Sequence, residues 1–149
     1  MKVLVQRVKH ASCVVNNQTT GAIEQGLLLF ISFNQTDTDN LIPYMAKKVA
    51  NLRILEDDQG KMNLSIKTLD YPVLSIPQFT LEADTKKGNR PSFVNALDPK
   101  KAVPFYQAFN HALEAEGIHV ETGIFGADMA INLINDGPVT VMLEKTTEK

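Results

Sequence analysis

The sequence lacks the features that mark secreted, membrane-spanning and cluster-binding proteins. Its 149 residues include a single cysteine, Cys13, which excludes an intrachain disulfide framework and a multi-cysteine metal site. No apolar run approaches the roughly 20 residues that a helix needs to cross a bilayer. The first ten residues, MKVLVQRVKH, have alternating charges and no long apolar segment, so they do not resemble a signal peptide. We therefore expect a cytoplasmic protein with no membrane partner.

The chain also lacks an overall basic charge. Its net charge is −2, so any nucleic-acid partner must bind through a local patch. Aromatic residues make up 7% of the chain, whereas proteins that bind single strands use stacking platforms in a basic groove. A non-catalytic RNA-binding module is therefore disfavoured but stays open as an alternative. The 44% of hydrophobic residues and the length are typical of one globular domain, residues 1–149.

The sequence patterns of standard hydrolases and cofactor enzymes are missing as well. The three histidines, His10, His111 and His119, are scattered, and no HExxH pattern occurs. The chain has no P-loop, no GxGxxG and no GxSxG nucleophile elbow. Cys13 lies in a β-rich segment without a neighbouring charge pattern, which favours a buried structural thiol. We expect neither a metal nor a cofactor.

What is present is a series of β-rich segments with two helical ones. One helix is expected from the Asp37–Asp39 region to Arg53, and another from Asp98 to Ala115. Pro104 predicts either a kink in the second helix or a later start. The pattern is typical of an α+β protein. Strands are expected at 2–15, 26–33, 71–81, 118–122, 128–135 and 139–143.

Two stretches contain residues that ordinary strands avoid. In LSIPQFTL (74–81), Pro77 cannot donate a ladder hydrogen bond, and Gln78 would bury an amide. Taken alone, this pattern is typical of a strand end or a bulge. In NDGPVT (135–140), the Asp-Gly-Pro sequence is typical of a hairpin turn.

Together with five other stretches, these two resemble the D-aminoacyl-tRNA deacylase family, formerly called D-tyrosyl-tRNA deacylase. The resemblance covers nearly the whole chain, and its motifs occur in order and at the family's spacing. They are QRV (6–8), GLLL (26–29), GKMNL (60–64), QFTL (78–81), AD followed by GNRPSF (83–93), TGIFGADM (122–129) and NDGPVT (135–140).

The resemblance implies a fold, an activity and an assembly. The fold is a compact, barrel-like single domain with a mostly antiparallel sheet and two main helices. The activity is hydrolysis of the ester that links a D-amino acid, or mischarged glycine, to the 3′ end of tRNA, with rejection of L-aminoacyl-tRNA. The assembly is a homodimer with active sites at the interface.

The resemblance also assigns roles to residues. Gln78, Phe79 and Thr80 are the candidate catalytic residues, with backbone N–H groups near Phe79 and Thr80 as oxyanion donors. Gly137 and Pro138 form a cis peptide that reaches into the partner's pocket, accepts the substrate α-ammonium and excludes an L side chain. Thr80 is a possible nucleophile, but the sequence offers no evident base beside it. We favour attack by water, assisted by the vicinal 2′-hydroxyl of the terminal ribose.

Supporting residues follow in the same way, each with a plainer alternative. Arg7 is expected to brace the Gly-Pro loop, the alternative being a surface charge on a strand. Met129 is expected to line the pocket, although a core methionine is nearly as good an interpretation. Lys86, Lys87 and Arg90 are expected to meet phosphates of the tRNA, the alternative being a solvated loop.

The sequence departs from the family pattern at Pro77, where the family usually has serine. A Pro-Gln-x-Thr motif resembles a related branch of tRNA deacylases that tolerates some L-amino acids. The remaining motifs, including Val139 after Gly-Pro, follow the ordinary branch. We therefore expect a strong preference for D-aminoacyl-tRNA, with a deacylase of relaxed specificity as the alternative.

Overall fold

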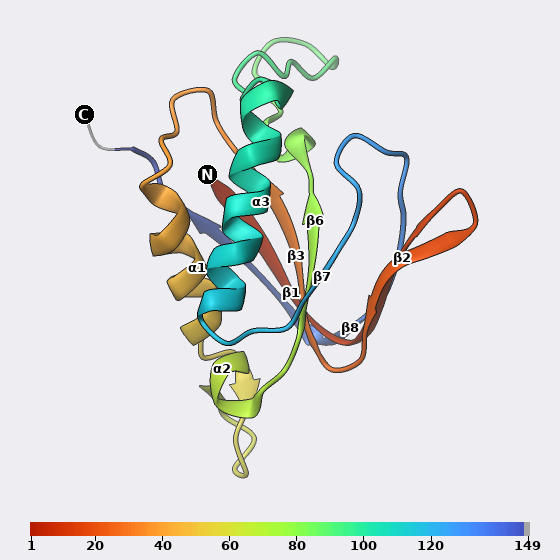
Figure 1. Cartoon of the computed structure of the whole chain (residues 1–149), viewed down its shortest axis with the longest axis vertical. Helices are drawn as coiled ribbons and strands as arrows, with labels where there is room; N and C mark the ends of the chain where they lie inside the picture. The colour runs from red at the N-terminus through yellow and green to blue at the C-terminus, as the bar shows by residue number, and fades with distance from the viewer. Residues whose placement is uncertain (148–149) are drawn as a thin grey trace.

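The fold is built around one long strand. The structure is a computed structural model that describes residues 1–147. Strand β1 (Lys2–Val15) pairs antiparallel with β8 (Ala130–Glu144) along nearly its whole length. Its other edge pairs with β3 (Gly26–Ser32) and then with β2 (Gln18–Ile23), both antiparallel. Figure 1 shows this arrangement, in which β1 lies between β3, from the early part of the chain, and β8, from its late part.

Two parallel strands extend the sheet beyond β3. Strand β6 (Val73–Pro77) pairs with β3, and β7 (Val120–Thr122) pairs with β6. The sheet curls so that its two ends meet, and the Thr20 hydroxyl of β2 donates to the carbonyl of Thr122 in β7 at 3.2 Å. The result is a nearly closed, barrel-like sheet in which antiparallel pairs predominate, which confirms the predicted α+β class.

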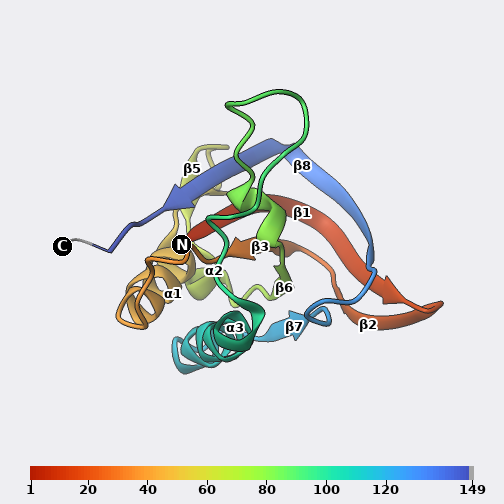
Figure 2. The ribbon, with the colours of Figure 1, turned by 90° about the horizontal axis from the view of Figure 1, so that it is seen from above.

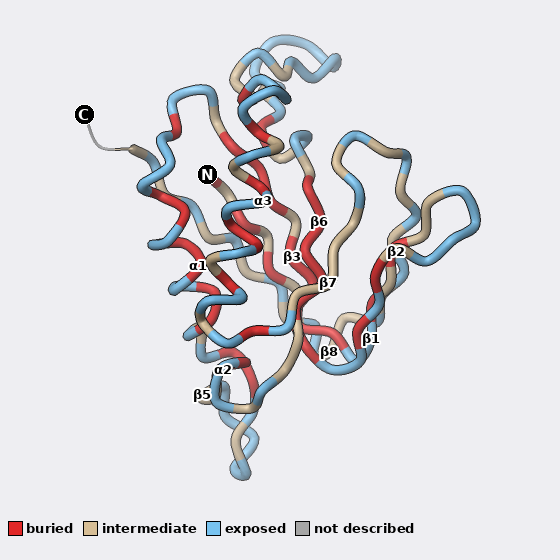
Figure 3. The backbone as a smooth tube through the Cα atoms, viewed as in Figure 1, coloured by how far each residue is buried: buried red, intermediate tan, exposed pale blue. Residues whose placement is uncertain are grey.

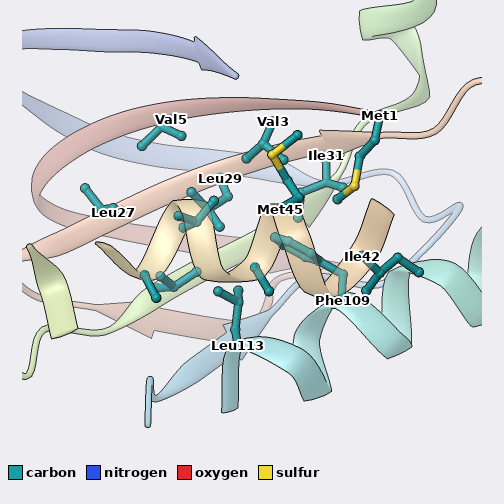
Figure 4. Packing of buried hydrophobic residues seen from close by; sticks show 14 of the residues in the cluster. Met1, Val3, Val5, Leu27, Leu29, Ile31, Ile42, Met45, Phe109 and Leu113 are labelled. Carbon is teal, nitrogen blue, oxygen red and sulfur yellow. The ribbon is translucent and has the colours of Figure 1, made fainter. Parts of the chain in front are cut away.

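The two long helices cover one face of this sheet (Figure 2). Parallel neighbours need a long crossover, so α1 (Leu41–Asn51) connects β3 to β6 and α3 (Pro99–Ala115) connects β6 to β7. None of the helices within residues 1–147 has the length and apolar character needed to cross a membrane. Between the helices and the sheet lies the main core (Figures 3 and 4), whose largest fully buried members are Leu27, Leu29, Ile31, Met45, Ile66, Phe109 and Leu113.

Helix α3 begins and ends at the predicted signals. The carboxylate of Asp98 accepts the backbone N–H of Lys100 at 2.8 Å, and Pro99 occupies the first helical position, where its missing N–H costs nothing. Gly117 follows the helix with a φ of +89°, a left-handed value that glycine adopts readily. Pro104 lies on the exposed side of a helix that already starts at Pro99, so the predicted later start is wrong.

Helix α1 begins later than predicted. Asn40 occupies the capping position, and its side chain makes no capping hydrogen bond. Asp37, one of the predicted caps, is instead buried: its carboxylate lies 2.6 Å from the Met1 ammonium and accepts the backbone N–H of Asn34 at 2.8 Å. A tertiary ion pair has therefore taken the carboxylate that the local pattern assigned to the helix.

A second apolar cluster fills the face of the sheet that turns away from the helices. Cys13 belongs to it and is fully buried, which confirms the predicted structural thiol. The half-buried side chains of Met129, Ile131 and Leu133 pack against this cluster. Its buried members are Val8, Ala11, Cys13, Ile23, Leu28, Leu74 and Ile76.

Two predicted strand boundaries are wrong. The strand expected at 71–81 ends at Pro77 and is followed by a 3-10 helix, η1 (Phe79–Glu82). The expected hairpin at 135–140 is absent, because β8 continues through it beside β1. Pairing with a long neighbouring strand thus overrides the local turn chemistry. The remaining short elements are β4 (Leu55–Glu56), β5 (Met62–Leu64) and α2 (Ile66–Leu69), and a turn joins β4 to β5.

A buried tyrosine makes the stability of this fold sensitive to alkaline pH. The Tyr106 hydroxyl of α3 donates to the carbonyl of Ser75 at 2.6 Å, and burial raises the pKa of the Tyr106 phenol above its ordinary value. The unfolded chain then loses this proton at lower pH than the folded protein does. The contribution to stability is complete below the ordinary pKa of about 10 and is lost as pH rises through the higher folded pKa.

We expect the free energy of unfolding to fall above pH 10 partly through Tyr106. Tyr106→Phe should lower the free energy of unfolding at pH 8 by about 1 kcal/mol through the lost hydrogen bond. Between pH 9.5 and 11.5, the free energy of unfolding of this variant should fall less steeply than that of the wild type. Denaturant titrations at several pH values provide the measurement, with the exposed Tyr44→Phe as control. Parallel pH profiles for wild type and Tyr106→Phe would contradict the prediction.

Candidate active site

The segment Gln78–Thr80 lies where β6 leaves the sheet. The N–H of Gln78 makes the last contact with β3, donating to the carbonyl of Ile31 at 2.7 Å. The chain then turns into η1, whose first 3-10 bond runs from the N–H of Leu81 to the carbonyl of Gln78 at 3.2 Å. The N–H groups of Phe79 and Thr80 precede that bond, so the helix does not use them.

Pro77 fits this strand end because its ring faces a gap in the ladder. On the β7 side, Val73 donates to His119 and the carbonyl of Ser75 accepts the N–H of Gly123. Successive residues of a strand alternate between its two neighbours, so Pro77 also faces β7, whose pairing with β6 ends at Ser75. The missing N–H therefore removes no ladder hydrogen bond.

A pocket of about 230 Å³ opens beside this segment. Phe79 stands at its edge with 55% of its surface exposed and packs edge-on against Phe93, with 5.1 Å between ring centroids. Met129 lines the pocket, as the sequence predicts. The full lining is Ile76, Pro77, Gln78, Phe79, Gly126, Ala127, Met129 and Ile131, of which Ile76, Gly126, Ala127 and Ile131 were not predicted as site residues.

The hydroxyl of Thr80 has no base beside it in this arrangement. Its Oγ1 accepts a hydrogen bond from Nε2 of Gln78. An amide is not a base, so this contact does not activate Thr80 as a nucleophile. Within residues 1–147, no three His, Cys, Asp or Glu side chains gather closely enough to hold a metal ion.

Gly137 and Pro138 lie in a bulge of β8. Gln6 pairs with Thr140 and Val8 with Asn135, so the four residues 136–139 stand opposite Arg7 alone. The side chain of Asn135 closes the bulge by accepting the N–H of Val139 at 2.8 Å and donating to Thr140 at 2.9 Å. The Gly137–Pro138 peptide is cis.

Arg7 holds this bulge from inside the protein. Its residue surface is only 4% exposed, so it is not the surface charge considered as the alternative. Nε donates to the carbonyl of Asp136 at 3.0 Å, and Nη1 donates to the carbonyl of Ile54 at 2.8 Å. The carboxylates of Asp136 and Glu56 lie 3.7 and 3.6 Å from the guanidinium.

Gly137 has no room for a side chain. Its φ of +136° is one that residues with a Cβ rarely adopt. A Cβ atom there would lie 2.9 Å from the backbone nitrogen of Val139 and 3.1 Å from Nη2 of Arg7. The glycine thus lets the bulge close over the guanidinium.

Within one subunit the two predicted halves of the site do not line the same cavity. The 230 Å³ pocket is formed by residues 76–79 and 126–131, and neither Gly137 nor Pro138 is among its lining residues. Both are exposed on β8, beside Arg7 and β4.

Comparisons with known proteins identify the family of this chain. The sequence model of the D-Tyr-tRNA(Tyr) deacylase family matches residues 4–144. The chain belongs to this family. It is 49% identical to the D-aminoacyl-tRNA deacylase of Geobacillus sp. (strain WCH70), over 97% of this chain and 95% of that protein. It is 51% identical to the D-aminoacyl-tRNA deacylase of Halalkalibacterium halodurans, over 97% and 99%.

Solved structures agree with the deacylase fold. A structure described as the c-Myc DNA unwinding element binding protein superposes with a TM-score of 0.92 and 36% identity, covering 99% of this chain and all of that one. A structure described as a probable eukaryotic D-amino acid tRNA deacylase has a TM-score of 0.83 over 95% of this chain and 97% of its own. At 18% identity, the second structure supports the fold alone.

The three predicted tRNA-binding residues of this deacylase family member lie outside the pocket. Lys86, Lys87 and Arg90 are exposed on the loop that follows η1 and projects beyond the start of α3 (Figure 1). Two hydrogen bonds of 2.8 and 2.9 Å between the backbones of Asp84 and Ser92 close the base of this loop. The loop therefore presents its cations to solvent, outside the lining of the pocket.

Proposed function

We propose that the protein hydrolyses the ester bond of D-aminoacyl-tRNA and releases the free D-amino acid and tRNA. Full-length similarity to curated D-aminoacyl-tRNA deacylases supports this activity. The observation that carries the proposal is the pocket at the end of β6, whose lining includes Gln78 and Phe79 of the family motif. An aminoacyl-tRNA substrate also supports a location in the cytoplasm.

The chemistry requires little machinery because an aminoacyl ester is already activated. The N–H groups of Phe79 and Thr80 are free of the 3-10 helix and suited to stabilise the oxyanion of the tetrahedral intermediate. Water is the nucleophile, and the vicinal 2′-hydroxyl of the terminal ribose assists it. Gln78 and Thr80, joined by their side-chain hydrogen bond, shape the pocket.

Selectivity for D-amino acids comes from the Gly137–Pro138 bulge. Its carbonyls accept the substrate α-ammonium, and the backbone leaves no room for an L side chain. Glycine has no side chain to exclude, so glycyl-tRNA is also a substrate. Pro77 lines the same pocket. The alternative to strict selectivity is a deacylase whose specificity is relaxed by Pro77.

The complete site is composed from two subunits of a homodimer. One subunit contributes the pocket at Gln78–Thr80, and the exposed Gly137–Pro138 bulge of its partner closes it. Two observations support this arrangement: the two halves line no common cavity within one chain, and β8 pairs only with β1 among residues 1–147. A second copy related by two-fold symmetry supplies both missing halves at once.

The tRNA meets the exposed cations of the loop that follows η1. Lys86, Lys87 and Arg90 supply a local basic patch on a chain whose net charge is −2. Such a patch contacts acceptor-stem phosphates without reading sequence. A module that binds RNA and has no activity is the rival function.

A panel of three substrates tests the proposed activity. We expect the purified protein to release amino acid rapidly from D-Tyr-tRNA and Gly-tRNA and at least about 100-fold more slowly from L-Ala-tRNA, because an L side chain meets the Gly-Pro backbone. Release is measured with labelled amino acid at saturating substrate. Comparable rates on L-Ala-tRNA would favour the relaxed deacylase, and binding of tRNA without any release would favour the inactive module.

The role of Thr80 is tested by removing its hydroxyl. We expect Thr80→Ala to lower kcat by less than about tenfold, because the hydroxyl shapes the pocket and forms no covalent intermediate. The exposed Thr85→Ala, five residues along the chain, serves as the matched control. Mass spectrometry of protein quenched during turnover provides the decisive measurement, since an acyl group trapped on Thr80 would overturn the mechanism.

Subunit mixing tests whether the active site is shared. Gly137→Val disrupts the bulge, and Ala127→Phe fills the pocket, so each homodimer should be inactive. Random mixing restores one intact site in each heterodimer, so we expect about a quarter of wild-type activity. A mixture of Ala127→Phe with Met129→Phe, both in the pocket, is the control and should stay inactive. No recovery in the first mixture would place each site within one subunit.

A further inference from the structure

A buried charged cluster lies behind the candidate catalytic segment. At its centre is Glu82, the last residue of η1, whose side chain is only 2% exposed. Its Oε2 accepts the hydroxyl of Ser32 at 2.8 Å, and its Oε1 accepts the side-chain amide of Asn34 at 3.3 Å. The ammonium of Lys2 lies 3.2 Å from Oε2. Residues from β1, from β3 and from the loop after β3 therefore converge on one carboxylate.

Burying this charged cluster costs free energy that an apolar side chain would not cost. Taking a carboxylate out of water costs free energy, which its partners repay only when the geometry is good. An apolar side chain of similar size often gives equal or greater stability. What a carboxylate with three partners provides is a fixed position, because its hydrogen bonds have direction and an apolar contact does not.

The element that Glu82 holds in place is η1, which is not stable on its own. Helix η1 has four residues, too few for a helix to be stable without tertiary contacts. Its start is held by the hydrogen bond from Gln78 to the carbonyl of Ile31. Its end is held by Glu82 and by the ammonium of Lys2, which donates to the carbonyl of Leu81 at 3.2 Å. The exposed residues between these anchors are Phe79 and Thr80.

Glu82 acts on the site through the backbone alone. It does not line the 230 Å³ pocket. It lines a separate polar cavity of about 260 Å³ together with Lys2, Asn34 and Lys86. We propose that Glu82 is a positioning residue for deacylation, whose buried carboxylate anchors η1 and thereby orients the N–H groups of Phe79 and Thr80. This inference rests on the proposed function.

Two variants of Glu82 test the proposal at different strengths. Glu82→Ala removes all three contacts and frees the end of η1, and a displacement of about 1 Å in a reacting group can cost about 100-fold in rate. We expect kcat to fall at least about tenfold while KM changes less than about threefold, because the pocket walls stay in place. Glu82→Gln keeps an oxygen for Ser32 and loses the ion pair, so its kcat should lie between those of Glu82→Ala and wild type.

Hydrogen exchange separates positioning from general loss of stability. The control is Ser65→Ala, which removes a buried hydroxyl that accepts the N–H of Thr68 at 3.1 Å and caps α2. We expect it to lower Tm without changing kcat. Glu82→Ala should in addition speed amide exchange across residues 78–83, which Ser65→Ala should leave unchanged.

The outcomes are distinguishable. If Glu82→Ala keeps kcat within twofold of wild type, or leaves exchange at 78–83 unchanged, Glu82 does not position the site. Should Glu82→Ala fail to fold, the same two measurements on Glu82→Gln decide the question. If the wild-type protein has no deacylase activity, the proposed function has failed, and faster exchange confined to 78–83 still supports the anchoring of η1.

Discussion

The arrangement of the candidate site depends on a guanidinium placed where the sheet expects an apolar side chain. Val3, Val5 and Arg7 alternate along β1, and all three are buried. A buried guanidinium must find acceptors for its donors, and Arg7 finds them in two carbonyls from distant parts of the chain, those of Ile54 and Asp136. Lysine could not replace Arg7, because a single ammonium lacks the planar fork of donors that lets a guanidinium reach two diverging carbonyls. Arg7 thus holds the Gly-Pro bulge in place, although it lies more than 120 positions away in the sequence.

The pocket on the other side of the protein depends on a single carbonyl in a similar way. The carbonyl of Ser75 accepts both the hydroxyl of Tyr106 from α3 and the N–H of Gly123 at the exit of β7. One wall of the pocket continues from β6 to Gln78, and the other continues from Gly123 to Met129. Both walls therefore start from the same buried junction.

Much of the fold follows from local sequence, and the exceptions have physical causes. Helix α3 begins at its Asp-Pro signal, and β1 and β3 follow their apolar patterns, because these signals act within a few residues. The cap of α1 and the hairpin at 135–140 were mispredicted, because Asp37 pairs with Met1 and β8 pairs with β1, and contacts across the whole chain are invisible to local patterns.

The site shows the same division. The family motifs named Gln78, Met129 and Arg7 as candidates, whereas nothing in the sequence singled out Glu82. No local signal distinguishes a carboxylate that will be buried by Lys2 and Ser32 from one that stays in water. A comparable limit applied to Gly126 and Ala127, which the sequence showed only as part of the TGIFGADM motif and which lie in the pocket wall because β7 returns beside β6.

Pro77 shows how a departure from a family motif can leave the chemistry intact. Its missing N–H faces a gap in the ladder, and Gln78 still donates to Ile31, so η1 starts at the same place. The amides of Phe79 and Thr80 lie beyond that anchor and do not depend on the residue before it. What changes is the pocket wall, where a rigid apolar ring stands instead of a hydroxyl. Because the wall and the proposed oxyanion donors are separate parts of one strand end, we expect selectivity at this position to vary while the hydrolytic step stays the same.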